Sequence, residues 1–391
     1  MSIYFDNAAT TVCGETAAQA VYTAMKEVYG NPSSVHRLGQ KAAVVLDRAR
    51  SDTAKVLNCE AKEVYFTSGG TEADNWAIRS AARTGALKGK KHIISSKFEH
   101  HAVLHTLNAL EKEGFEVTLL DVYSDGLVRV DDLADAVRED TALVTIMYAN
   151  NEIGTVQPVA EIGALCRLKG VIFHTDAVQA VGHIPVDVKR DNVDMLSLSA
   201  HKFHGPKGVG ALYVRQRTPL NIFIEGGAQE RGKRGGTENV PGVSGLAAAL
   251  TEANERLEEN AAKTIAIRER LVNALLEIPK SRYNGDPTKR LPGIINFCFE
   301  GIEGESLLLK LDAAGICASS GSACTSGSLD PSHVLLAIGL SHEVAHGSLR
   351  LSFNERNSVE EADFIIKTLP TIIEKLRSMS PVWEKIQKGG K

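Results

Sequence analysis

Closely spaced cysteines are missing from this sequence. Zinc sites and disulfide frameworks need cysteines at short, regular spacings, so their absence argues against both. We expect most of the thiols to be reduced and buried as small apolar side chains. Cys324 is the exception, because its neighbours are small and polar and predict an exposed loop. The 391 residues contain six cysteines, which are Cys13, Cys59, Cys166, Cys298, Cys317 and Cys324.

An excess of charge and long apolar runs are also missing. The 44 Lys and Arg residues nearly balance the 48 Asp and Glu residues, so no nucleic-acid partner is expected. The longest apolar runs, such as residues 243–250, are far shorter than the roughly 20 residues that cross a bilayer. The N-terminus shows no basic stretch followed by an apolar stretch, as an export signal would. We therefore expect a cytoplasmic protein without membrane contact.

Strand-like and helix-like segments alternate between about residues 60 and 215. Such alternation predicts an α/β domain with a mainly parallel sheet between layers of helices. Ligands of such sheets bind at the carboxyl ends of the strands. The expected strands are residues 63–67, 92–95, 116–120, 143–147, 170–175, 195–198 and 209–214.

A second, smaller α+β domain is expected after a long helix at residues 240–280. It begins with a strand at residues 293–299 and ends with a helix from about Ser358. The N-terminal stretch before Glu15 is expected to pack near it. We predict a large domain of residues 13–255 and a small domain of residues 1–12 and 256–391, which carries a cysteine loop at about residues 318–330.

A lysine follows one of the expected strands directly. The segment SAHKFHGPKG at residues 199–208 places Lys202 just beyond the carboxyl end of a strand. A lysine there can reach a bound cofactor, although an isolated lysine in such a place is more often a solvated surface residue. Ser199 and His201 flank it, and both can donate hydrogen bonds to phosphate oxygens. The segment suits an aldehyde cofactor that carries a phosphate.

A loop with two glycines, TSGGTEADN at residues 67–75, joins a strand to a helix that begins near Thr71. Backbone amides at a helix N-terminus bind phosphate, and Gly70 allows a close approach. Glycines after a strand are also common in turns, so this loop alone leaves both interpretations open. It matches neither G-x-x-x-x-G-K-[ST] nor G-x-G-x-x-G, which removes the main support for a nucleoside triphosphate or a dinucleotide.

A carboxylate, Asp176, ends the strand that precedes it. At this position it could keep a pyridine nitrogen protonated, which makes the ring an electron sink. An isolated aspartate here more commonly caps the following helix. Gln179, one turn later, could hydrogen bond the phenolic oxygen of the same cofactor. A lysine, a carboxylate and a phosphate-binding loop at three strand ends together indicate pyridoxal 5′-phosphate (PLP).

Motifs along its whole length make the sequence similar to the cysteine desulfurases, and to their nitrogen-fixation and iron–sulfur-assembly branch. The resemblance implies the PLP-dependent transferase fold of class-V aminotransferases, with a large domain around a mainly parallel sheet and a smaller α+β domain. It also implies a homodimer with cofactor sites at the subunit interface. The matching segments are YFDNAATT (4–11), GNPSSVH (30–36), TSGGTE (67–72), ANNEIGT (149–155), HTDAVQ (174–179), SAHK (199–202), RGKRGGTEN (231–239), SSGSACTSGS (319–328) and GSLRLSF (347–353).

The resemblance implies a role for each cofactor residue. Lys202 holds PLP as a Schiff base, Asp176 pairs with the ring nitrogen and Gln179 with the phenolic oxygen. His100 stacks on the ring and takes part in proton transfer; without the resemblance it would be read as a surface histidine at a helix start. The other implied cofactor contacts are Gly70, Thr71, Asn151, Ser199, His201 and, from the partner subunit, Thr237.

The activity implied is removal of sulfur from L-cysteine, with release of L-alanine. The Cys324 thiolate attacks the substrate sulfur and keeps it as a persulfide, which requires an ionised and accessible thiol. Arg350 binds the substrate carboxylate, to which guanidinium geometry is well suited; alone, it would be read as a surface arginine at a strand edge. Asn151 and Asn31 are the other implied substrate contacts.

The persulfide implies a further partner, an iron–sulfur scaffold or another sulfur-acceptor protein. We expect no intrinsic metal site, although Cys324 is a candidate transient ligand of a nascent cluster through its persulfide. Two enzyme alternatives share this machinery: a selenocysteine or cysteine-sulfinate lyase, which need not use Cys324, and an aminotransferase, which needs a keto-acid substrate. A scaffold or regulator without activity is disfavoured because Lys202, Asp176 and Cys324 are all present.

Overall fold

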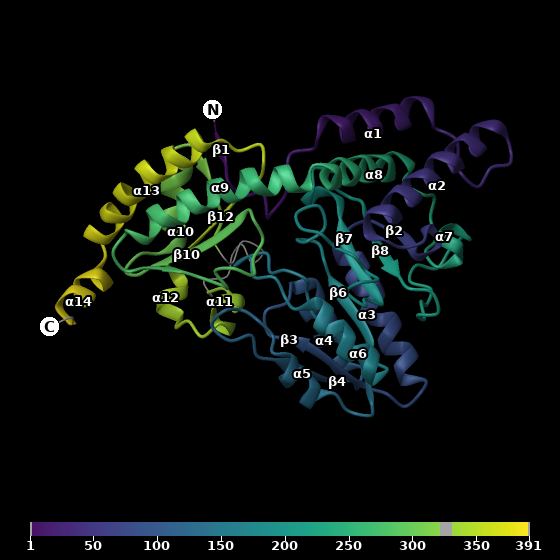
Figure 1. Ribbon diagram of the computed structural model, residues 1–391, viewed down its shortest axis with the longest axis horizontal. Coiled ribbons are helices and arrows are strands. Elements are labelled where there is room, and N and C mark those ends of the chain that lie inside the picture. Colours follow the sequence, from purple (N-terminus) through teal and green to yellow (C-terminus); the bar gives the residue numbers. More distant parts are fainter. Residues whose placement is uncertain (1, 321–330, 390–391) are drawn as a thin grey trace.

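A computed structural model describes residues 2–320 and 331–389 of the chain (Figure 1). Its centre is a seven-stranded sheet in which β8 runs antiparallel to both of its neighbours and the other pairings are parallel. The expected mainly parallel sheet is confirmed. In spatial order its strands are β2 (Val64–Thr67), β8 (Gly210–Val214), β7 (Met195–Ser199), β6 (Ile172–Asp176), β5 (Thr141–Thr145), β3 (His92–Ser96) and β4 (Glu116–Leu120).

Helices cover both faces of this sheet, which explains why β3, β5, β7 and β8 are buried along their whole length. Successive strand residues point to opposite faces. Ile93 and Leu143 therefore join the core under α3 and α4, while Ile94 and Val144 join the larger core on the other face. The helices of this part are α1 (Glu15–Glu27), α2 (Arg37–Leu57), α3 (Gly70–Ala86), α4 (His101–Lys112), α5 (Val130–Ala136), α6 (Val159–Lys169), α7 (Gln229–Gly232) and α8 (Val240–Glu255), with the 3₁₀ turns η1 (Ala61–Glu63) and η2 (Ala200–Lys202).

One expected strand is displaced along the chain. Residues 143–147 were predicted, whereas β5 is Thr141–Thr145. Ile146 and Met147 are nevertheless buried, and the Ile146 N–H still donates to the His174 carbonyl oxygen at 3.2 Å. The apolar run thus continues beyond the strand into the buried loop that leads to Asn151, and hydrophobicity alone does not separate the two.

The long helix predicted at residues 240–280 is two helices, α8 and α9 (Leu257–Leu276), with a break at Arg256. No proline or glycine marks this break. Instead, α8 packs against α1 and α2, whereas α9 packs against α13 (Val359–Ser378). The chain therefore changes direction where it leaves one core for another, and Figure 1 shows the two helices end to end between the two halves of the molecule.

The second half contains a three-stranded antiparallel sheet with β10 in the middle. A short parallel pairing of β1 with β11 ties the N-terminal stretch to this half, as expected. We propose the domain division predicted from the sequence, with the small domain formed by residues 1–12 and 256–391. Its elements are β1 (Ile3–Tyr4), α9, β9 (Ser281–Tyr283), β10 (Ile294–Phe299), α10 (Gly304–Ala313), β11 (Ile316–Cys317), α11 (His333–Ala337), α12 (His342–His346), β12 (Ser348–Ser352), α13 and α14 (Pro381–Gly389).

Within the described residues, no helix combines the length and the apolar character that crossing a membrane requires.

Candidate active site

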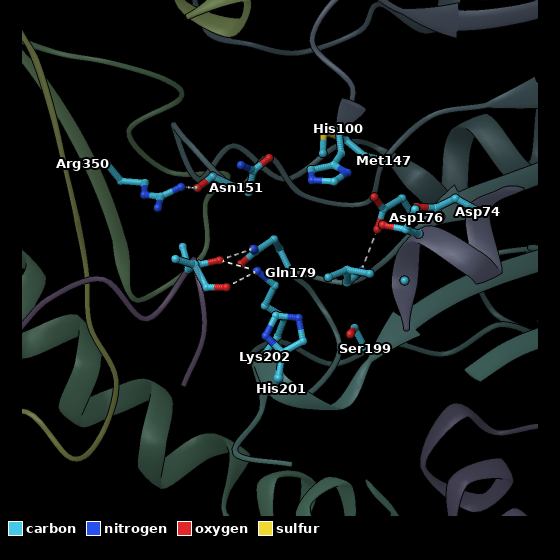
Figure 2. A pocket seen from close by; sticks show the side chains of 15 residues that line it. Asp74, His100, Met147, Asn151, Asp176, Gln179, Ser199, His201, Lys202 and Arg350 are labelled. Atoms are coloured by element: carbon cyan, nitrogen blue, oxygen red, sulfur yellow. Dashed lines mark hydrogen bonds between the residues drawn. The ribbon is translucent and has the colours of Figure 1, made fainter. Parts of the chain in front are cut away.

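A cavity of about 320 Å³ opens at the carboxyl ends of β5, β6 and β7, which is where the sequence predicts a ligand (Figure 2). This volume lies within the usual range of small-molecule sites. Most of the predicted site residues converge there from segments far apart in the chain. The predicted residues that line the cavity are Gly70, Thr71, His100, Asn151, Asp176, Gln179, Ser199, His201, Lys202 and Arg350.

Lys202 is held at the cavity wall by the N-terminal segment. Its Nζ donates hydrogen bonds to the carbonyl oxygens of Ala8, at 2.6 Å, and Ala9, at 2.9 Å. The Gln179 side chain donates to the same Ala8 oxygen at 3.0 Å. Both alanines line the cavity, and the sequence analysis did not select them because a small side chain carries no chemistry of its own.

The N-terminus of α3 forms one end of the cavity. Gly69, the N-cap residue just before the helix, has a φ of +154° and, being a glycine, has no side chain to cap the first amides of α3. A Cβ on Gly70 would lie 2.6 Å from Val178 Cγ2, so a larger residue would fill this space. Unpaired amides at a helix start, with Thr71 and Ser199 beside them, have the donor set that a phosphate requires.

His201 adds an imidazole to this end. Its Nδ1 lies 3.1 Å from Thr10 Oγ1. Burial and the nearby Lys202 charge lower the pKa of His201 to about 4, so the ring is neutral at pH 7. A neutral imidazole has one N–H, which can donate to an anion.

Asp176 supplies a carboxylate at the end of β6 and lines the cavity. Its Oδ1 accepts a hydrogen bond from the Val178 amide at 2.9 Å. Burial raises the pKa of Asp176 to about 6, while the Val178 amide and the charge on Lys202 favour the ionised form. Asp176 is therefore mainly ionised at neutral pH and can pair with a protonated ring nitrogen.

His100 caps the N-terminus of α4 rather than lying free on the surface. Its Nδ1 accepts a hydrogen bond from the Ala102 amide at 3.1 Å. Burial, together with the nearby Lys202 charge, lowers the pKa of His100 to about 4. The neutral ring must then carry its proton on Nε2, because Nδ1 is an acceptor. Figure 2 shows this ring at the side of the cavity opposite Lys202.

Arg350 reaches the cavity from β12 and is almost fully buried. One guanidinium nitrogen donates to Asp6 Oδ1 at 2.8 Å and the other to the Asn151 carbonyl oxygen at 3.1 Å. Its Nε is buried without a hydrogen-bond partner among the described residues. Arg350 thus offers positive charge and donor capacity to an anionic ligand.

Cys324 lies outside the described residues, but the neighbouring segments contact Arg350 of the cavity on one side and, on the other, residues next in the chain to its lining residues Asn151 and His100. On one side, Ser319 pairs with Arg350 through two backbone hydrogen bonds, of 2.6 and 3.3 Å. On the other side, Ser332 Oγ donates to the buried carboxylate of Glu152 at 2.5 Å. His333 Nε2 lies 2.9 Å from the carbonyl oxygen of Glu99, directly before His100.

The other cysteines differ in accessibility. The expectation that most are buried was wrong for the five cysteines that the structure describes, because Cys166 and Cys298 are buried, Cys59 and Cys317 are half-buried, and Cys13 is exposed. Cys13 follows the N-terminal segment as it leaves the site, and a sequence gives no measure of that exposure. Burial raises the pKa of Cys59 and Cys166 to about 12 and that of Cys298 to about 11, so these three stay protonated.

Two predicted site residues do not line the cavity of this chain. Asn31 is exposed in the turn before α2, where its Oδ1 accepts a hydrogen bond from the Ser33 amide at 2.9 Å. Thr237 is exposed in the loop between α7 and α8. Before that loop, the carboxylate of Glu230 in α7 accepts hydrogen bonds from the Arg50 guanidinium at 2.7 and 2.8 Å. Their roles stay predictions.

Asp74 is a cavity residue that the sequence analysis missed. It follows Thr71 by three residues and therefore lies one helical turn further along the same side of α3. That spacing was the available signal, but it does not reveal that Asp74 is buried or that it lies beside Asp176.

Comparisons with known proteins identify the family of the chain. The model of the aminotransferase class-V family matches residues 3–365. A protein named cysteine desulfurase IscS from Methanosarcina thermophila is 52% identical over 98% of this chain and 95% of its own length. A solved NifS-like protein superposes with a TM-score of 0.91 at 39% identity, covering 96% of this chain and 100% of its own. A structure titled SspA in complex with cysteine gives a TM-score of 0.80 at 36% identity, covering 90% of this chain and 99% of its own. The chain therefore belongs to the class-V aminotransferase family, as one of its cysteine desulfurases.

Proposed function

We propose that this chain uses PLP to take sulfur from L-cysteine, releases L-alanine, and carries the sulfur as a persulfide on Cys324. One observation carries the proposal: the amine of Lys202, the carboxylate of Asp176 and the N-terminus of α3 face one cavity. Arg350 lines the same cavity; the segment before Cys324 pairs with Arg350, and the segment after it binds Glu152, the neighbour of the lining residue Asn151. An aminotransferase would share the first three features but would not need the cysteine.

The residues present fit PLP. Lys202 would hold its aldehyde, Asp176 its ring nitrogen and Gln179 its phenolic oxygen. Bound there, PLP supplies an electron sink that makes the α-hydrogen of an amino acid acidic. The donors around its phosphate would be Thr71, Ser199, His201 and the first amides of α3, including that of Gly70.

Proton transfer is assigned to Lys202 and His100. Lys202 places its Nζ at the cavity wall, and this amine is assigned to take the substrate proton. His100 has its proton on Nε2, because Nδ1 accepts from the Ala102 amide. His100 is therefore suited to donate a hydrogen bond or a proton at the side of the cavity opposite Lys202.

Arg350 is assigned to the substrate carboxylate, with Asn151 beside it. We predict that Arg350→Lys lowers kcat/KM for L-cysteine by about 10- to 100-fold, chiefly through KM, because a lysine cannot reproduce the paired hydrogen bonds of a guanidinium. Steady-state alanine formation measures this. Arg282→Lys is the control, because Arg282 is exposed on β9 of the same sheet. An unchanged KM in Arg350→Lys contradicts the assignment.

Cys324 is assigned as the nucleophile. It follows Ser319 by five residues, and an extended segment of that length reaches about 17 Å. Its thiolate attacks the substrate sulfur: a sulfur–sulfur bond forms, the substrate Cβ–S bond breaks, and the electron pair of that bond stays with the three-carbon fragment. Protonation of that fragment gives alanine, so one cysteine and one enzyme thiol become one alanine and one enzyme persulfide.

The chain is proposed to work as a homodimer that meets through α1 and the start of α2. Tyr22, Met25 and Tyr29 follow one another at helical spacing and are 59%, 62% and 70% exposed, and Val35 beyond them is 90% exposed. Such an apolar surface is unusual on a monomer. The same contact is proposed to bring Thr237 of the partner subunit to the phosphate.

A charge on this surface is expected to separate the subunits. We predict that Met25→Glu lowers the dimer fraction at least about tenfold and weakens PLP binding, whereas Leu87→Glu, at an even more exposed position just after the end of α3, changes neither. Light scattering and PLP titration measure the two effects. A wild-type protein that is monomeric and binds PLP fully would contradict the dimer.

The persulfide sulfur is proposed to pass to an iron–sulfur scaffold or another acceptor protein, with Cys324 as a transient cluster ligand. A cytoplasmic location is proposed with it, because a persulfide carrier works with reduced thiols. Labelled sulfur carried from cysteine to a purified scaffold protein by wild type, but not by Cys324→Ser, is the expected result. Equal transfer by both proteins would contradict this step.

The activity itself is tested by loading the purified protein with PLP and adding L-cysteine with a reductant. Alanine and sulfide in equal amounts are the expected products. Pyruvate together with a new amino acid would indicate an aminotransferase instead. A protein that binds no PLP would refute the proposed function.

A further inference from the structure

A second carboxyl group, Asp74, lies beside Asp176 at the cavity. Asp74 comes from α3 and is only 1% exposed, yet it lines the cavity. Its Oδ1 has no hydrogen-bond partner within residues 2–320 and 331–389. Figure 2 shows the two carboxyl groups next to each other at one side of the site. The mechanism proposed above gives Asp74 no task.

The groups that face Asp74 provide no positive charge. His174 Nε2 lies 3.6 Å from Asp74 Oδ1, but burial lowers the pKa of His174 to about 3. The His174 ring instead lies between two hydroxyl groups, with Thr145 Oγ1 at 2.8 Å and Ser197 Oγ at 3.0 Å. The nearby Asp176 repels a negative charge on Asp74. Burial raises the pKa of Glu99 to about 8, so this third acid is mainly protonated at neutral pH and supplies no positive charge either.

Asp176 has neighbouring groups that stabilise a negative charge more strongly than those of Asp74. The Val178 amide donates to Asp176, and the positive charge of Lys202 acts on Asp176. Within the described part of the chain, the group that favours the ionised form of Asp74 is the neutral hydroxyl of Ser197. Two negative charges side by side in a site of low dielectric constant are strongly unfavourable, so such a pair loses its protons in two separate steps. Burial and the charge on Asp176 raise the pKa of Asp74 well above its usual value.

We propose that Asp74 and Asp176 share a single negative charge at neutral pH, with the charge on Asp176 and the proton on Asp74. Asp74 is then a positioning residue that acts through Asp176, and the charge opposite a cofactor ring belongs to the pair. The part of this inference that concerns PLP rests on the role proposed above for Asp176. The protonation of Asp74 does not rest on it.

The pair predicts an unusual pattern in variants. Asp74→Asn keeps the charge of the pair unchanged, so the dissociation constant for PLP should change less than about threefold. Asp176→Asn removes the repulsion and so lowers the pKa of Asp74, although its burial remains; opposite a positively charged ring Asp74 is then expected to ionise in place of Asp176, and PLP binding weakens only about tenfold. The double variant has no negative charge at this position, so it should bind PLP at least about a hundredfold more weakly than wild type. This loss of affinity exceeds the product of the losses expected for the two single variants.

The proton on Asp74 is tested in the cofactor-free protein by infrared spectroscopy with ¹³C-labelled aspartate, which separates aspartic acids from Glu99. Wild type is expected to show a protonated aspartate band at pH 7.5 that is absent in Asp74→Asn, and in Asp176→Asn the band is expected to be lost at a lower pH than in wild type, because the repulsion is removed while the burial remains. Glu99→Gln is the control and should retain the band. Circular dichroism checks that each variant is folded. If a variant does not fold, the presence or absence of the band in wild type still tests whether a buried aspartate is protonated.

Two results would overturn the proposed shared charge. One is a wild-type spectrum without a protonated aspartate band. The other is a double variant whose loss of PLP affinity equals the product of the losses in the two single variants. Failure of the proposed function has a different signature, a wild-type protein that binds no PLP while the infrared band is still present. The two inferences therefore fail independently.

Discussion

Replacing Cys324 by serine is expected to lower the rate of alanine formation from L-cysteine at least about a hundredfold. A serine hydroxyl stays protonated at neutral pH and is a poor nucleophile toward sulfur, whereas a cysteine thiolate is a good one. PLP binding should be unchanged, because Cys324 is not among the groups assigned to the cofactor. Alanine assays and the visible spectrum of the protein with PLP measure the two effects.

Cys13→Ser is the matched control for this prediction. Cys13 is exposed and does not line the cavity, so its loss should leave the rate within about twofold of wild type. Alanine formed at the wild-type rate by Cys324→Ser would instead favour a lyase that releases sulfur without a protein persulfide. The assignment of PLP and of Lys202 would survive that result.

Lys202→Ala is expected to have the second large effect, a loss of at least about a thousandfold in rate. Two functions would be lost together, the covalent hold on PLP and the amine that moves the substrate proton. In wild type, reduction with borohydride should fix PLP to the peptide that contains Lys202. Mass spectrometry of digested protein detects this addition.

Lys207→Ala provides the comparison. Lys207 follows Lys202 by five residues, is exposed and does not line the cavity. Its variant should keep both activity and the borohydride product. PLP fixed to Lys207, or a Lys202→Ala protein with more than about a tenth of wild-type activity, would contradict the role of Lys202.

The convergence of Lys202, Asp176 and Thr71 could be predicted from the sequence because each follows a strand of one sheet. Parallel strands bring their carboxyl ends to the same edge, so the order of strands need not be known. β8 runs antiparallel but carries none of these three residues. The PLP prediction therefore required the strands and the residues that follow them to be identified, but not the order of the strands in the sheet.

Asp74, in contrast, could not be recognised from the sequence. Its importance comes from burial and from the neighbouring Asp176, and both depend on how α3 packs against β6. The hold of Ala8 on Lys202 is likewise a tertiary contact between residues far apart in the chain. The break between α8 and α9 follows from a change of packing partner, which local propensity does not record.

The central claim is that sulfur leaves cysteine at this cavity and arrives on Cys324, and one single-turnover experiment tests it most directly. PLP-loaded protein is mixed with one equivalent of L-cysteine without reductant, and the alanine released is compared with the mass of each cysteine peptide. We expect one alanine per active site and one extra sulfur atom on the peptide that contains Cys324. Alanine without protein-bound sulfur, or the extra sulfur on Cys13 or Cys317, would contradict it.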